Sequence, residues 1–161
     1  MAGDSRPLRE RPGDFVFIVG FGLFAVTSFC FDRLAALDVD FHDPNAGFFA
    51  TAFRSYGEAV DPLTLVNPKW LQVMSGISAF VFGPFYLVLI AAFVRGDDRI
   101  RLPAIAYVAA MVYSVVVHVT MEFVGDVPPV AVGPMLATYT PYLLLPLALA
   151  WRMRHERPFA A

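Results

Sequence analysis

An imidazole and a carboxylate stand four residues apart in SVVVHVTMEF, a stretch that is otherwise apolar enough to lie in a lipid bilayer. Residues at positions i and i+4 of a helix share one face, so His118 and Glu122 are neighbours there and Ser114 continues their stripe. Ionisable residues inside transmembrane helices are costly, and they commonly mark ligand sites or proton relays. We therefore predict general acid–base chemistry, with Glu122 as the acid or base and His118 as its partner. The alternatives are a packing histidine bonded to a carbonyl or hydroxyl, and an interfacial carboxylate in solvent.

Two more carboxylates are expected at the same membrane level. Asp32 closes the first apolar run in SFCFD, and Asp61 precedes the second in VDPLTLV. Three acids around an apolar cavity would bind a cation or protonate an alkene. The alternative for Asp61 is a turn residue before Pro62, and the alternative for Asp32 is a helix-end residue paired with Arg33.

Other polar or adaptable side chains share helical faces with these groups. Tyr107 and Met111 precede Ser114 on its stripe, and Thr138 and Tyr142 share a face of the last apolar run. A metal site is not expected, because His42 and His118 are the histidines on the relevant side and no tight His/Cys/Asp spacing accompanies them. The sequence contains neither a glycine-rich phosphate motif nor a nucleophile elbow, so no cofactor is expected.

Four apolar runs must position these residues. The 161-residue chain is 58% hydrophobic and 16% charged, whereas soluble domains average roughly 45–50% and about 25%. The runs cover about residues 14–31, 70–94, 102–124 and 134–153, close to the roughly 20 residues that cross a bilayer as a helix. The first is too long for a signal-peptide core and lacks a cleavage pattern. We predict one all-α integral membrane domain over residues 1–161, a bundle of four transmembrane helices.

The basic residues predict the orientation of the bundle. Of the twelve, nine precede the first run, join the second to the third, or follow the fourth: Arg6, Arg9, Arg11, Arg95, Arg99, Arg101, Arg152, Arg154 and Arg157. The positive-inside rule then places both termini in the cytoplasm. On the opposite side, residues 46–60 have aromatic side chains at helical spacing and predict a short interfacial helix. The net charge of −2 suggests no nucleic-acid partner.

Several segments, in order, resemble one known family. They are Phe31-Asp32, Asp61-Pro62-Leu63 with Pro68 and Trp70, GPFYLVLIAAFVRG, RLPAIAY, YSVVVHVTME and TPYLLLPLALAWRMR. Together they resemble the EXPERA-domain family, which includes emopamil-binding protein (a sterol Δ8–Δ7 isomerase) and the sigma-2 receptor. The resemblance implies a four-helix membrane fold whose ligand cavity opens toward the bilayer. It also implies sterols or lipophilic amines as ligands, and a homodimer.

The resemblance implies a site as well as a fold. In the isomerase, acidic groups protonate one alkene carbon and assist removal of a proton elsewhere, and cationic amines mimic the carbocation between these steps. The expected catalytic residues are Glu122, His118 and Asp32. The resemblance supports Glu122 and allows Asp32 as a substitute, whereas His118 is an addition that the family pattern does not require and that could act as acid or base near neutral pH. The expected ligand contacts are Asp32, Asp61, Ser78, Tyr107, Met111, Tyr113, Ser114, Thr138 and Tyr142. Tyr113 and Tyr142 would face a cation.

The chain departs from the isomerase in its acids. The first run lacks that enzyme's His and Glu pair, so Asp32 alone could substitute, and Ser78 stands near the place of an acid in the second run. Three functions stay open: an isomerase of a sterol or terpenoid alkene, a non-catalytic binder of sterols or cationic amphiphiles in which Asp32 pairs with an ammonium, and an assembly protein without a ligand. Arginine-rich ends without a lysine-rich tail favour a bacterial plasma membrane, with the endoplasmic reticulum as the eukaryotic alternative.

Overall fold

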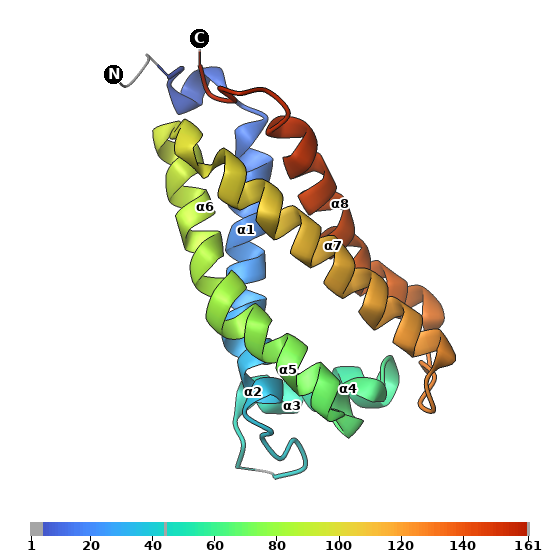
Figure 1. Ribbon diagram of the computed structural model, residues 1–161. Helices are drawn as coiled ribbons and strands as arrows, with labels where there is room; N and C mark the ends of the chain where they lie inside the picture. The colour runs from blue at the N-terminus through green and yellow to red at the C-terminus, as the bar shows by residue number, and fades with distance from the viewer. Residues whose placement is uncertain (1–4, 44, 161) are drawn as a thin grey trace.

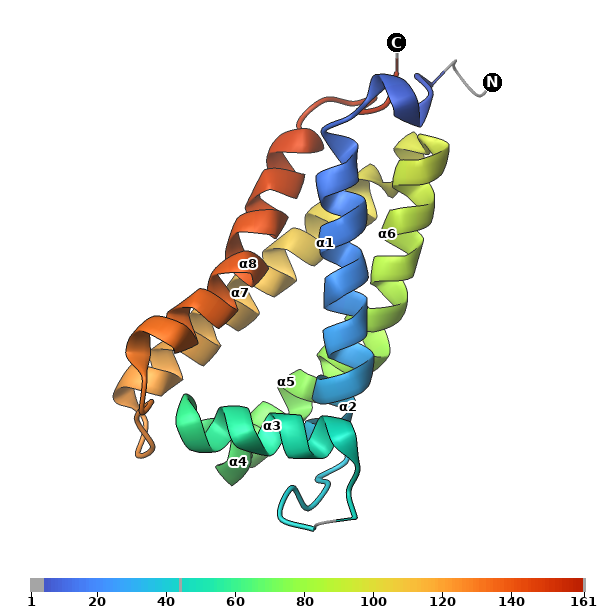
Figure 2. The same cartoon turned by 180° about the vertical axis from the view of Figure 1, so that it is seen from behind.

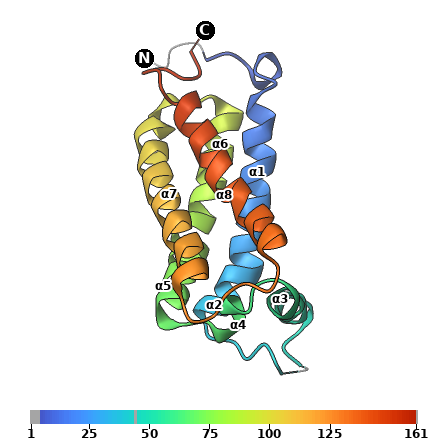
Figure 3. The ribbon, with the colours of Figure 1, turned by 90° about the vertical axis from the view of Figure 1, so that its right-hand side faces the viewer.

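Four helices of membrane-spanning length and apolarity run through the computed structural model, which describes residues 5–43 and 45–160 (Figure 1). They cover Asp14–Ala36, Lys69–Arg95, Asp98–Val124 and Val132–Arg152. The predicted all-α membrane fold with four spans is confirmed. Both chain ends lie at the same end of the bundle, and the short helices within residues 33–77 lie at the other (Figure 3). The side of the membrane that each end faces stays a prediction.

The first two spans are each interrupted by a π-helical turn. Helix α1 (Asp14–Thr27) passes through the turn Ser28–Asp32 into α2 (Arg33–Ala36), and α5 (Lys69–Ile77) passes through Ser78–Phe82 into α6 (Gly83–Arg95). In the second span Pro84 explains the turn, because proline donates no backbone hydrogen bond and presses on the preceding turn. The two turns are in contact, since the hydroxyls of Ser28 and Ser78 lie 3.1 Å apart. Such turns are frequent at functional sites.

The first span is longer than predicted. It continues past Phe31 to Ala36, because Asp32 and Arg33 stay within the helix instead of ending it. Asp32 can remain there since Ser78 of the neighbouring span donates a hydrogen bond to its carboxylate. A polar residue at the end of an apolar run is therefore a poor marker of a helix end in this chain.

A short helix crosses the base of the bundle. Helix α3 (Phe48–Ala59) occupies the segment expected to form an interfacial helix and runs across the ends of the spans (Figure 2). Helix α4 (Leu63–Val66) follows, and Asn67 ends it in the left-handed conformation with φ 45°. Pro68 then starts α5 in extended geometry. The turn at Asn67 and Pro68 leads the chain into α5 and keeps the segment around Asp61 at the end of the bundle opposite the termini.

The spans pack as two pairs. Helix α1 packs along α6, while α7 (Arg101–Val124) packs along α8 (Val132–Arg152). The pairs approach one another near the chain ends and diverge toward α3 (Figures 1 and 2). Buried aromatic rings fill the closer half, where Phe21 stacks on Tyr86 at 5.8 Å between ring centroids and meets Tyr107 edge-on at 6.1 Å. Association of helices in lipid depends on such packing, because lipid tails are as apolar as the side chains.

A buried ion cluster closes the end that carries the termini. The guanidinium of Arg11 pairs with Asp14 and also donates to the carbonyl of Phe93 at 2.9 Å. Arg152 donates to the other oxygen of Asp14 at 2.8 Å, so α1 and α8 are joined. The ring of Phe159 is fully buried against both guanidiniums, 4.8 and 5.0 Å from their central carbons. Every carboxylate oxygen of Asp14 thus has a cationic partner.

Candidate functional site

A cavity of about 370 Å³ opens where the two helix pairs diverge. All four spans and α3 contribute to its walls, which are mostly apolar. Pockets for small molecules in proteins are typically about 300–1,000 Å³, apolar, and furnished with a few polar groups. Two groups of polar side chains, from different parts of the fold, lie at the wall of this cavity or directly behind it.

The first polar group lies on the two π-helical turns. Asp32 and Ser78 both line the cavity, and the Ser78 hydroxyl donates to Asp32 Oδ2 at 2.6 Å. Behind them, the fully buried Ser28 shares a hydrogen bond with Ser78. The wider helical turns place these three side chains at one level of the membrane. Asp32 is thereby held by neutral hydroxyls and presents its carboxylate at the cavity wall.

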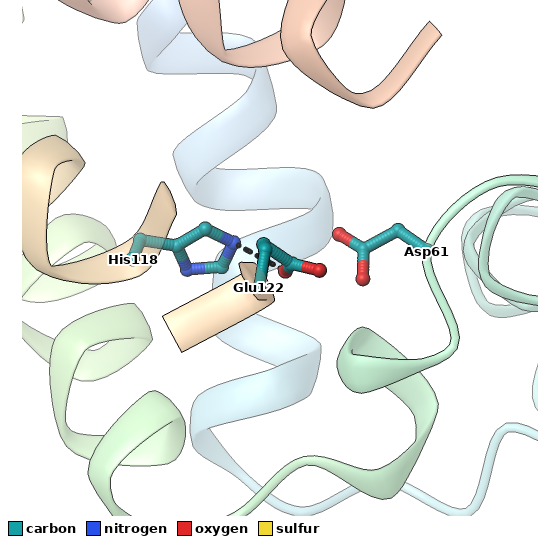
Figure 4. A group of neighbouring side chains, drawn as sticks. All are labelled: Asp61, His118 and Glu122. Atoms are coloured by element: carbon teal, nitrogen blue, oxygen red, sulfur yellow. Dashed lines mark ion pairs between the residues drawn. The ribbon is translucent and has the colours of Figure 1, made fainter. Parts of the chain in front are cut away.

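The second polar group consists of Asp61, His118 and Glu122 (Figure 4). His118 and Glu122 extend from neighbouring turns of α7, and Asp61 reaches toward them from the turn between α3 and α4. His118 Nε2 and Glu122 Oε1 are 3.2 Å apart, and one ligand atom from each of the three residues lies within 4.8 Å of the others. His118 lines the cavity, while Glu122 and Asp61 are fully buried behind it. We call these residues the Asp61–His118–Glu122 cluster.

The cluster is short of hydrogen-bond donors. Neither oxygen of Glu122, nor Nε2 of His118, nor Oδ1 of Asp61 has a hydrogen-bond partner among the described residues. The contact between His118 and Glu122 is close but lacks hydrogen-bond geometry. Only Asp61 Oδ2 is satisfied, by the hydroxyl of Tyr139 at 2.8 Å. Buried polar groups are normally paired, so four unpaired atoms converging on one point demand a physical explanation.

Burial disfavours charge at the edge of this cluster. It raises the pKa of Asp61; the hydrogen bond from Tyr139 opposes this, and the nearby Glu122 carboxylate adds to it. Burial likewise raises the pKa of the Tyr56 hydroxyl on α3, which lines the cavity. Without a positive partner, a second carboxylate beside Asp61 is electrostatically unfavourable.

The other residues predicted for the site divide into two sets. Met111, Ser114, Thr138 and Tyr142 line the cavity together with Asp32, Ser78 and His118. Tyr107 does not, because it is packed in the aromatic core between the spans. Tyr113 does not either: it is 72% exposed on the outer face of α7. These two tyrosines therefore lie outside the cavity that those other predicted residues share. When a helix is apolar on nearly every side, its sequence gives little indication of which face points toward the cavity.

Several residues that line or support the cavity were not predicted from the sequence. Tyr139 contacts both parts of the second group, since its hydroxyl binds Asp61 and its ring lies 4.3 Å from that of His118, centroid to centroid. Phe53 and Tyr56 enter from α3, which covers the open end. Ser28 supports Ser78. For Ser28 a signal existed, because it precedes Asp32 by four residues on the same helical face.

The cluster also changes the expectation about metals. No metal site was predicted, because no tight His/Cys/Asp spacing accompanies His118 along the chain. The fold brings one imidazole and two carboxylates within metal-binding distance of each other. These are common ligands of Zn²⁺ and related ions.

Comparison with known protein families identifies the family of this chain. The family model described as EXPERA, the expanded EBP superfamily, matches residues 48–153, from α3 to just past α8. The chain belongs to the EXPERA family. Neither the curated proteins nor the solved structures give a significant match. The EXPERA match includes Asp61, His118 and Glu122 but begins after the first span, so Asp32 lies outside it. The protein is thus a multi-pass membrane protein of the EXPERA family with four spans.

Proposed function

We propose that the protein binds a sterol-like or terpenoid lipid within the membrane. The observation that carries this proposal is the cavity itself, about 370 Å³, mostly apolar, and formed between spans that diverge. Lipid ligands are in keeping with the EXPERA family. An assembly protein without a ligand would have little reason to keep such a space, because helix packing in membranes depends on close contact.

Asp32 gives the cavity a preference among lipids. Its carboxylate lines the space and accepts a hydrogen bond from Ser78, so it is positioned to accept another from a ligand hydroxyl or to pair with an ammonium. Charge-assisted hydrogen bonds contribute about 1.5–3 kcal/mol. A lipophilic amine is therefore expected to bind more tightly than its neutral analogue.

Binding to protein in lipid nanodiscs tests this proposal. The probes are a sterol and a matched pair of lipophilic ligands, one carrying a tertiary amine and one neutral. We expect Asp32→Asn to weaken binding of the amine by about 10- to 100-fold, the equivalent of one charge-assisted hydrogen bond, and to change the neutral analogue little. Asp40→Asn is the matched control, because Asp40 is an exposed acid on the same side of the bundle. Equal binding by the wild type and Asp32→Asn would remove Asp32 from the site, and absence of sterol and amine binding to the wild type would refute the proposal.

A second candidate function is isomerisation of a carbon–carbon double bond. It is favoured by Asp32, an acid that lines the cavity and could exchange a proton with a bound alkene. General acid–base steps contribute about 10²- to 10⁴-fold to a rate. Incubation in D₂O with candidate sterols and terpenoid alkenes, followed by mass spectrometry, would reveal deuterium in substrate or product. Uptake of deuterium by the wild type that Asp32→Asn abolishes would support catalysis. Lipids that bind but take up no deuterium would exclude isomerisation of those lipids and leave binding as the function.

The membrane and the orientation are part of the proposal. Nine of the twelve basic residues belong to the chain ends and the turn between α6 and α7, at one end of the bundle. The positive-inside rule supports a cytoplasmic location for this end. Labelling of Ser5→Cys and Asp40→Cys, each combined with Cys30→Ser to remove the native thiol, should then distinguish the two sides in intact cells, with the label reaching only position 40 from outside.

A further inference from the structure

We propose that Asp61, His118 and Glu122 bind one divalent transition-metal ion, with Zn²⁺ as the best match. This site goes beyond lipid binding, because the lipid cavity and the cluster are adjacent but formed by different side chains: of the three, only His118 lines the cavity.

The donor atoms have a suitable arrangement. A tetrahedral ion about 2.0–2.2 Å from each ligand atom holds its ligand atoms about 3.3–3.6 Å apart. The ligand atoms of the cluster already lie within 4.8 Å of one another, so small side-chain rotations bring them onto one ion. Two ligands from adjacent turns of α7 and one from a distant turn converge on one point (Figure 4). One imidazole with two carboxylates suits Zn²⁺ better than Mg²⁺, which prefers oxygen ligands and water.

The charge of the cluster calls for a cation. With both acids ionised and the imidazole neutral, the forms in which these side chains bind metals, the cluster would carry two negative charges, and no lysine or arginine of the described residues forms an ion pair with it. Asp14, buried to a similar degree at the other end of the bundle, has both Arg11 and Arg152. A divalent ion would neutralise the cluster in the same way. Burial of the two acids is then compatible with their charge.

The unpaired atoms are an independent sign of a missing ligand. Glu122 is fully buried and His118 is 7% exposed, yet Nε2 of His118 and both oxygens of Glu122 have no hydrogen-bond partner among the described residues. These atoms, with Oδ1 of Asp61, are the ones that would bind the metal. Groups around them hold the ligands in place: Tyr139 donates to the other oxygen of Asp61, and the Tyr139 and Trp70 rings contact the imidazole. Such supporting contacts are typical of metal sites.

The ion would have a structural consequence. It would tie α7 to the turn between α3 and α4, and so fix the wall of the cavity that α3 covers. His118 and Glu122 would then be metal ligands and not proton carriers. Asp32 would be the acid left facing the lipid, as both candidate functions above require.

The test uses the full-length protein in nanodiscs, stripped with a chelator and reloaded with ZnCl₂. We expect one zinc per chain by mass spectrometry after gel filtration. Competition with a chromophoric chelator should show that His118→Ala and the isosteric Glu122→Gln raise the zinc Kd by more than about 100-fold, beyond the about 10- to 100-fold typical of changes to supporting residues. The control is a variant with both His42→Ala and His155→Ala, which removes the other two histidines, both exposed, and should keep its zinc.

Other outcomes would overturn the assignment. Substoichiometric zinc in the reloaded wild type would do so, as would wild-type affinity in both cluster variants, or uptake of Mg²⁺ in preference to Zn²⁺. Amine binding measured on the same samples separates the two proposals. A Glu122→Gln protein that loses zinc but still binds the amine is folded, and failure of the wild type to bind the amine would leave a positive zinc result standing.

Discussion

The two ends of the bundle bury carboxylates in opposite ways. Near the chain termini, Asp14 lies between Arg11 and Arg152, and both of its oxygens accept hydrogen bonds from guanidinium groups. At the other end, Glu122 and Asp61 are equally buried beside one imidazole, and three of their four oxygens have no partner among the described residues. The first end is also filled by aromatic rings, whereas the second surrounds a cavity.

This difference indicates a structural role for the Asp14 end and a functional role for the end that surrounds the cavity. In the Asp14 cluster every carboxylate oxygen has a partner, so this cluster joins the helices at the end that lacks the cavity. The Asp61–His118–Glu122 cluster contains buried polar atoms without partners, which destabilise the fold unless a proton, an ion or a ligand binds them. Proteins retain such unsatisfied groups mainly at functional sites. If this interpretation holds, neutral substitutions at the two ends should change stability in opposite directions.

The largest effect is expected from Asp14→Asn. Removing this charge leaves the guanidiniums of Arg11 and Arg152 without their carboxylate partner, and breaking a buried ion pair typically costs about 3–5 kcal/mol. The free energy of unfolding in detergent should fall by about that amount, with an earlier thermal midpoint. A loss below about 1 kcal/mol, the value for exposed pairs, would mean that the cluster contributes little to closure of this end.

Glu122→Gln should act in the opposite direction in metal-free protein. The substitution keeps the shape of the side chain but removes an unpaired buried acid; an unsatisfied buried polar group costs about 1–3 kcal/mol, and more when it is charged. We expect stability to rise by about 1–3 kcal/mol in the presence of a chelator, measured by the same unfolding assay. With zinc added, the order should reverse, because only the wild type gains the stabilisation that ligand binding brings. A strong loss in chelator would show that Glu122 is already satisfied in the protein.

Ser78→Ala tests the one point at which the cavity end supplies a donor to an acid. Its hydroxyl donates to Asp32 at 2.6 Å, and hydrogen bonds to charged groups contribute about 1.5–3 kcal/mol. Because Asp32 is only partly buried, we expect a destabilisation of about 1.5 kcal/mol, at the lower end of that range. Ser75→Ala removes another hydroxyl from the cavity wall one turn earlier and should have a smaller effect.

The smallest effect should come from Arg54→Ala. Arg54 and Glu58 form an ion pair of 2.7 Å on the surface of α3, with side chains 41% and 52% exposed. Exposed pairs of this spacing contribute about 0.3–0.5 kcal/mol. A change in the free energy of unfolding within that range gives the value for an exposed pair, against which the effects at the two buried clusters can be compared. A much larger change would indicate that α3 depends on this pair to cover the cavity.

Part of this site could be predicted from sequence because its relations are local. His118 and Glu122 share a face of α7 by their spacing alone, and Asp32 falls at the same membrane level because spans of similar length begin and end together. Tyr113 was grouped with the cavity residues although it lies on the exposed face of α7, because α7 is apolar on nearly every side and the pattern does not fix which side faces the cavity. The role of Tyr139 was missed for the same reason in α8.

The pattern of apolar runs and motifs was enough to predict the membrane fold, its four spans and its family, because the bilayer imposes length and apolarity on each span separately. The packing of the helices was needed to show that Asp61 joins His118 and Glu122, that the π-helical turns place Ser78 on Asp32, and that Asp14 has cationic partners while Glu122 has none among the described residues. The physical reason is that each of these relations depends on how separate helices rotate and tilt against one another. In lipid that is set by packing between them and not by the pattern of any single helix.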